Sequence, residues 1–228
     1  TADGNTAVGS QALTTNVSGT GNVAMGLEAL KVNTASLNVA VGTAALTANT
    51  SGTNNVAMGS DASKANSTGS NTTAIGDSAL AANTADGNTA VGSQALTTNV
   101  DGTGNVAMGL EALKVNLASL NVAVGTAALT ANTQGTNNVA MGSDASKANI
   151  TGSNTTAVGD SALAANKADG NTAFGSQALT TNVDGTGNVA MGLEALKVNL
   201  ASLNVAVGTS ALTANTQGTN NVAMGSDA

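Results

Sequence analysis

The side chains best suited to bind a metal ion are acidic residues near glycines, such as Asp86, Asp101 and Asp169. Carboxylate oxygens are ligands that Ca²⁺ prefers. Calcium-binding repeats, however, place their carboxylates in a Gly-Gly-x-Gly-x-Asp pattern, which these residues lack. We therefore interpret them as solvated residues at chain corners, and the sequence predicts no metal site and no cofactor.

Two further patterns resemble known sites. The segment from Gly19 to Gly26 is rich in glycine, but it lacks the spacing and the lysine of a phosphate loop, which favours turn glycines. Methionine also recurs at one position of a repeat, where other copies carry valine, so we interpret it as core filler and not as a metal site. The methionines are residues 25, 58, 108, 141, 191 and 224.

Catalytic side chains are scarce. The chain contains no His, Cys, Arg or Pro, and its only aromatic residue is Phe174. General acid–base catalysis needs a group with a perturbed pKa in a pocket, and a smooth repeating chain supplies neither a pocket nor a unique residue. The sequence therefore predicts no catalytic residue and a protein that is not an enzyme.

The repeated segment Asn-Val-Ala-Met-Gly, as at 22–26, determines where all these side chains lie. Fourteen versions follow one another at intervals of 16 or 17 residues, and five intervals sum to 83 residues. Residues 1–83 and 84–166 differ at five positions, and 167–228 begins a third copy. A fixed short period predicts a solenoid, so 1–228 is interpreted as one repetitive region. Because the chain begins and ends inside a repeat, we expect it to be a piece of a longer protein.

The residues of one rung alternate as in a short strand, with Thr6 and Val8 on one face and Ala7 on the other. A second short strand is expected to carry Ala12 and Leu13 on opposite faces. Because large apolar side chains need an interior, we predict that two columns point into the coil. They are Val8, Met25, Val41, Met58, Ile75, Val91 and Met108, and Leu13, Leu30, Leu46 and Leu80.

Small and polar residues form two more columns. The alanines Ala7, Ala24, Ala40 and Ala57 are predicted to face neighbouring chains, because small side chains allow close approach and so thin a coil has a weak core. The asparagines Asn16, Asn33, Asn49, Asn66 and Asn83 are predicted to stack in an amide ladder at left-handed turns. All length variation follows these asparagines, which identifies the linkers as exposed corners.

A helix followed by a turn would also fit a period of 16 or 17 residues. Glycine and asparagine interrupt every rung, however, and the uninterrupted segments are too short for an independent helix. The predicted fold is all-β, a parallel β-roll or β-solenoid of about fourteen rungs.

The charge balance restricts the partners. Six Lys residues oppose thirteen Asp and Glu residues, giving a net charge of −7, and the lysines do not cluster. This argues against nucleic acid or an anionic membrane as a partner. No apolar run approaches the roughly 20 residues that span a bilayer, so we expect no direct membrane insertion by this segment.

The recurring Asn-Val-Ala-Met-Gly and Asn-Val-Ala-Val-Gly resemble the head repeats of YadA-like trimeric autotransporter adhesins, whose signature is Asn-Ser-Val-Ala-Ile-Gly. The resemblance covers all fourteen rungs. It implies a left-handed β-roll in a homotrimer, displayed outside a Gram-negative bacterium on the cell surface. There it would attach to host matrix, cells or solid surfaces, and outer-membrane anchoring would come from parts not present in this chain.

The sequence departs from that family pattern, because its rungs are slightly longer and an Ala-Leu pair follows the glycine by two residues. Similar repeats occur in phage tail fibres, so a tail-fibre shaft or receptor-binding segment of a virion is the alternative. An ice-binding solenoid is a third reading, although Val23, Val39 and Val56 interrupt the threonine ladder that such proteins present. A measurement of thermal hysteresis separates ice binding from the other two.

Overall fold

The computed structural model describes residues 2–228, and within that range it contains strands and turns but no helix. The chain forms two compact units, one ending at Leu117 and the other covering Ala118–Ala228. The all-β prediction is confirmed, and the helical alternative is not what the chain adopts.

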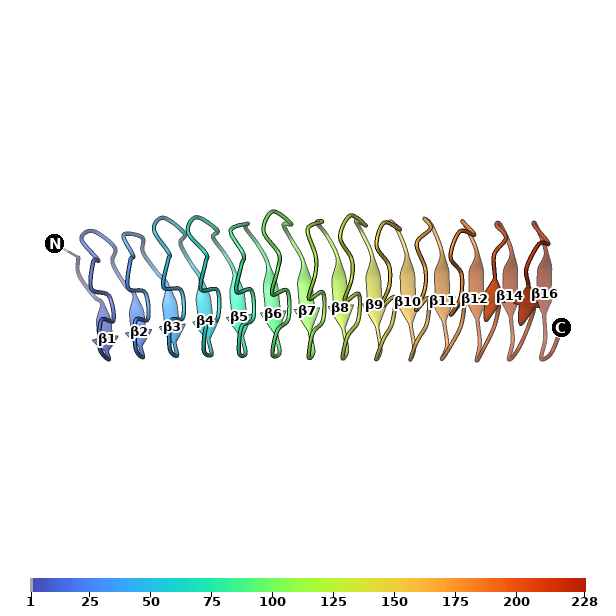
Figure 1. Cartoon of the computed structure of the whole chain (residues 1–228), viewed down its shortest axis with the longest axis horizontal. Helices are drawn as coiled ribbons and strands as arrows, with labels where there is room; N and C mark the ends of the chain where they lie inside the picture. The colour runs from blue at the N-terminus through green and yellow to red at the C-terminus, as the bar shows by residue number, and fades with distance from the viewer. Residues whose placement is uncertain (1) are drawn as a thin grey trace. The chain divides into compact units, whose positions relative to one another are not determined.

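In the first unit, each rung contributes one three-residue strand to a parallel sheet, and strands consecutive in the sequence are neighbours in the sheet (Figure 1). Equivalent residues lie side by side, as where Ala24 pairs with Ala40 and Met25 with Val41. This register aligns each column of side chains from rung to rung. The strands are β1 (Thr6–Val8), β2 (Val23–Met25), β3 (Val39–Val41), β4 (Val56–Met58), β5 (Thr73–Ile75), β6 (Thr89–Val91) and β7 (Val106–Met108).

The second unit has the same construction, with seven three-residue strands in its main parallel sheet and a separate parallel pair, β13 and β15. Both units are thus parallel β-solenoids with one rung per repeat, as predicted. The strands are β8 (Val122–Val124), β9 (Val139–Met141), β10 (Thr156–Val158), β11 (Thr172–Phe174), β12 (Val189–Met191), β13 (Val198–Asn199), β14 (Val205–Val207), β15 (Ala214–Asn215) and β16 (Val222–Met224).

The chain after each strand forms two successive turns. In the second rung, the Ala29 amide donates to the Gly26 carbonyl (3.5 Å) and the Lys31 amide donates to the Glu28 carbonyl (3.2 Å). The third residue of each turn, Glu28 and then Leu30, has a positive φ of 59° and 48°. This is the geometry of type II turns, and it reverses the chain within a few residues.

The turns correct the prediction that Ala12 and Leu13 lie on opposite faces of a second strand. In the second rung, the equivalent residues Ala29 and Leu30 are both fully buried. A left-handed residue breaks the two-residue alternation of a strand, so two consecutive side chains can enter the same interior.

Candidate self-association face

The strand alanines line the inside of each coil. Ala24, Ala40 and Ala57 are fully buried, and Ala7 is exposed in β1, which pairs with a strand on one side only. The prediction that these four alanines face neighbouring chains is therefore wrong. Ala24, Ala40 and Ala57 have no surface left for another chain to contact.

The larger apolar residues of the same strands point outward, so the prediction that they form an inward core column is also wrong. Val8 is 55% exposed, Met25 and Met58 are 43% exposed, Ile75 is 38% exposed and Met108 is 44% exposed. Val41 and Val91 are half-buried. The physical reason is the two-residue period of a strand: because Asn22 and Ala24 point inward, the residues between and after them must point outward.

The leucines of the turns lie inside the coil. Leu30, Leu46 and Leu80 are fully buried, and Leu13 in the first rung is half-buried. These leucines are the largest apolar side chains of the interior, which is otherwise lined mostly by alanine and asparagine.

The asparagines Asn33, Asn49, Asn66 and Asn83 are fully buried, while Asn16 is half-buried. Asn33 Nδ2 donates to Asn16 Oδ1 (3.1 Å), and Asn49 Nδ2 donates to Asn33 Oδ1 (2.8 Å). The ladder then has a gap, because Asn49 Oδ1 has no hydrogen-bond partner among the residues that the structure describes. A stack of amides therefore runs along part of this column and not along all of it.

A second asparagine column, which the sequence reasoning missed, begins the rungs. The Asn38 backbone amide donates to Asn22 Oδ1 (2.9 Å), which links one rung to the next. Asn38 Nδ2 and Asn49 Nδ2 both donate to the Gly52 carbonyl, each at 2.9 Å, so the two columns together hold the linker from inside. The signal was present in the sequence, since asparagine begins every rung except those starting at Thr72 and Thr155.

Two rungs in each 83-residue repeat break these columns. Ser63 and Ser146 replace the buried leucine, and neither hydroxyl has a hydrogen-bond partner among residues 2–228. In the following rungs, Thr72 and Thr155 replace the first asparagine. Thr72 Oγ1 donates to Asn55 Oδ1 (2.7 Å), but a threonine has no amide oxygen to offer to the next rung.

We call the outward side of each main sheet the sheet face. It consists of the second and fourth residue of every rung, and these residues are aligned by the strand register. All of them are Thr, Val, Met, Ile or Phe, so the sheet face carries no charge. In the first unit they are Thr6, Val8, Val23, Met25, Val39, Val41, Val56, Met58, Thr73, Ile75, Thr89, Val91, Val106 and Met108, and in the second unit the corresponding residues run from Val122 to Met224.

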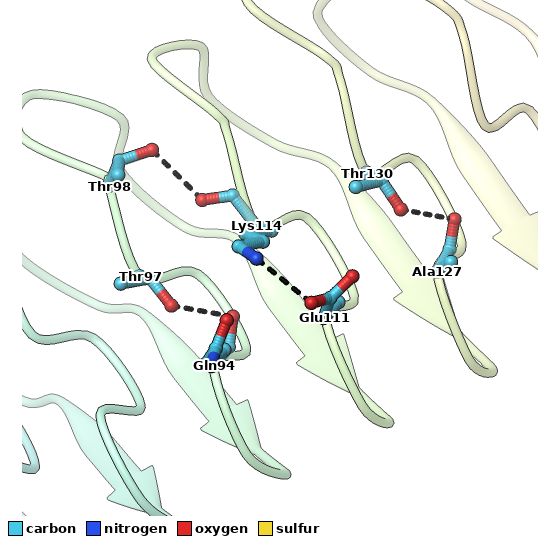
Figure 2. Close-up of polar contacts among 7 residues, drawn as sticks. All are labelled: Gln94, Thr97, Thr98, Glu111, Lys114, Ala127 and Thr130. Atoms are coloured by element: carbon cyan, nitrogen blue, oxygen red, sulfur yellow. Dashed lines mark hydrogen bonds and ion pairs between the residues drawn. The ribbon is translucent and has the colours of Figure 1, made fainter.

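Charged residues lie at the turns and linkers instead. Lys31 pairs with Glu28 across one turn (2.8 Å). Lys114 pairs with Glu111 in the same way (2.8 Å; Figure 2). In some rungs where threonine replaces the lysine, its hydroxyl donates across the turn, as from Thr97 Oγ1 to the Gln94 carbonyl (2.6 Å).

The three acidic residues first considered as metal ligands lie at linkers. The Ser70 amide donates to Asp86 Oδ1 (2.8 Å), the Ser153 amide donates to Asp169 Oδ1 (2.8 Å), and Asp101 is exposed. Within residues 2–228, no three His, Cys, Asp or Glu residues come together as a metal site, and no pocket is present. Over the same range, no helix has the length and apolar character to cross a membrane.

No family model matches the sequence, and comparisons with curated proteins and with solved structures return no match. The resemblance to adhesin head repeats therefore stays a prediction. The feature of the described residues that most clearly suggests an interaction is the uncharged, outward sheet face, because a continuous exposed apolar surface is typical of protein–protein contacts.

Proposed function

We propose that this chain is the structural and adhesive segment of a homotrimeric fibre displayed on a cell surface. The observation that carries the proposal is the sheet face of each unit. Its fourth-position residues form an uninterrupted column of Val, Met, Ile and Phe whose exposure in the single chain reaches 38–45% at Met25, Met58, Ile75, Met108 and Met191.

A partner for this face must be apolar and must repeat at the same spacing. Another copy of the chain meets both requirements, because its rungs repeat at the same strand separation. Burying a fully exposed large apolar side chain is worth about 1.5–3 kcal/mol, and most of these side chains are already more than half buried, so each rung contributes a part of that gain. The sum over many rungs opposes the cost of association.

The resemblance to adhesin head repeats adds two elements, the number of three chains and the location on a bacterial surface. The adhesive role is assigned to the linkers. Ser18, Asp101, Gln134, Ile150 and Lys167 are exposed linker residues, and they lie where the 83-residue copies differ. A ligand would meet many weak and similar sites along each fibre, so attachment would depend on avidity. A tail-fibre shaft of a virion is the alternative owner of the same assembly.

The test compares two variants that add the same charge at different places. The face variant carries Met25→Lys, Met58→Lys and Met108→Lys, and the corner variant carries Ser10→Lys, Thr43→Lys and Ser60→Lys, where the native residues are exposed. Sedimentation velocity should give a trimer for the wild type and the corner variant. The face variant should sediment as a monomer of about 21.6 kDa, because lysine ammonium groups cannot be buried against one another.

Circular dichroism keeps the comparison interpretable, since the β-spectrum of the face variant should match that of the wild type. A wild-type chain that remains monomeric at micromolar concentration contradicts the homotrimer. A face variant that stays trimeric contradicts the assignment of the sheet face of the first unit, even if the trimer itself is present.

A further inference from the structure

Another apolar surface lies outside the sheet face. In the rung 22–37, Leu27 at the corner, Val32 after the turns and Leu37 in the linker are 49%, 41% and 58% exposed. The rung 188–203 repeats the arrangement. There the residues are Leu193, Val198, Leu200 and Leu203, with 50%, 39%, 48% and 56% exposure. We call each of these sets an apolar belt, and Leu110, Val115 and Leu117 belong to a further one.

The coil itself does not require apolar residues at these positions. The rung 55–71 has Ser60, Ala65 and Asn71 at the positions of Leu27, Val32 and Leu37, and all three are exposed. Its strand β4 pairs with both neighbours in the same register as β2 does. The belts therefore add exposed apolar surface, although Leu37 also packs beside Gly21 of the neighbouring rung.

The charges within a belt are paired. Glu28 and Lys31 lie 2.8 Å apart, and Glu194 and Lys197 lie 2.8 Å apart, with about a third of each side chain exposed. If two belts meet about a two-fold axis, Lys31 of one copy can lie beside Glu28 of the other, since such an interface is self-complementary. Leu27 precedes this pair and Val32 follows it in the sequence, whereas Leu37 lies in the linker.

We propose that the apolar belts associate laterally with the belts of a second copy of this chain. A copy is the partner that offers apolar residues and a Lys–Glu pair in matching positions. It also offers a belt in every 83-residue repeat, so several weak contacts can form together. This contact uses different residues from the sheet face and does not depend on the proposed homotrimer.

The rung 55–71 supplies the substitutions for a test. The belt variant replaces each corner leucine by serine and each following valine by alanine, as that rung already has them. The substitutions are Leu27→Ser, Val32→Ala, Leu110→Ser, Val115→Ala, Leu193→Ser and Val198→Ala. Sedimentation velocity of the whole 228-residue chain is followed as protein and NaCl concentrations rise.

The wild type should form species larger than its smallest assembly, and salt should favour them, because it screens the repulsion between chains of net charge −7. The belt variant should keep the same smallest assembly. The association constant for larger species should be lower by roughly tenfold or more for each belt leucine removed.

The face variant Met25→Lys, Met58→Lys and Met108→Lys separates the two interfaces. It should change the smallest assembly while still forming larger species through its belts. The belt variant should keep the smallest assembly and lose the larger species. Wild-type chain that forms no larger species at any salt concentration overturns the proposal. So does a belt variant that associates as strongly as the wild type. Binding of the wild type to phosphatidylcholine vesicles without self-association would assign the belts to a lipid surface and overturn the proposal as well.

Discussion

At the scale of the residue, asparagine decides which side of each strand faces inward. The side-chain amide of Asn22 makes hydrogen bonds at both ends. Its Oδ1 accepts from the Asn38 backbone amide (2.9 Å), and its Nδ2 donates to the Ala35 carbonyl (2.9 Å). A buried amide left without partners costs about 1–3 kcal/mol, similar to the gain from burying a valine or methionine. The exposed Val and Met side chains, however, can still be buried by assembly, whereas the asparagine bonds need the closed coil.

The inward alanines lead to a prediction for one strand. Ala107 is fully buried in β7, while the next residue, Met108, is 44% exposed. Ala107→Leu should destabilise the coil by about 1–3 kcal/mol or more, because the extra atoms have no space in the interior. Chemical denaturation measures the change.

Met108→Leu is the control on the same strand, and it should leave the denaturation midpoint nearly unchanged. If Ala107→Leu were tolerated and only assembly suffered, the interior assignment of the alanine column would be incorrect.

At the scale of the element, the glycine after each strand is required by the neighbouring rung. Gly59 has a φ of 139°, and a Cβ built there would lie 2.4 Å from the Gly76 carbonyl oxygen. Gly59→Ala should therefore destabilise the coil by more than about 2 kcal/mol, since both the backbone conformation and the contact are unfavourable for alanine. Thermal and chemical unfolding measure the loss.

Gly87 provides the matched control. It also has a positive φ, of 69°, but a Cβ there would lie 3.8 Å from the nearest neighbouring atom. Asparagine occupies the same rung position at Asn54 and Asn71, with a φ of 58° in each. Gly87→Asn should be nearly neutral, and a large loss would mean that the linker, not the strand end, limits stability.

The period, the parallel strands and their register could be predicted from the sequence, because the repeat of Asn-x-Ala-x-Gly specifies them directly. Which side of each strand faces the interior could not be predicted, because the alternation of Val8 and Ala7 fits either side equally well. Only the hydrogen bonds of Asn22 and its equivalents decide it. The turns at Glu28 and Leu30 were missed for another reason: neither residue type ordinarily signals a positive φ.

At the scale of the whole molecule, each unit contains one place where its regular columns are interrupted. In the first unit, Ser63 and Thr72 replace a leucine and an asparagine in successive rungs, and the amide ladder has its gap beside them at Asn49. In the second unit, Ser146 and Thr155 likewise replace a leucine and an asparagine in successive rungs. In a repeat protein, stability is roughly a sum over rungs and their contacts, so such rungs should open before their neighbours.

Hydrogen exchange followed by mass spectrometry should show this pattern in each unit separately. Peptides from 55–87 should exchange faster than those from 22–54, and peptides from 138–170 faster than those from 171–203. Ser63→Leu should slow exchange in 55–87, because it restores the leucine column and removes a buried hydroxyl without a partner. Ser60→Leu, at an exposed position of the same rung, should leave exchange unchanged. Uniform protection along both units, or faster exchange in Ser63→Leu, would show that the interior has closed around the serine and that these rungs are as stable as the rest.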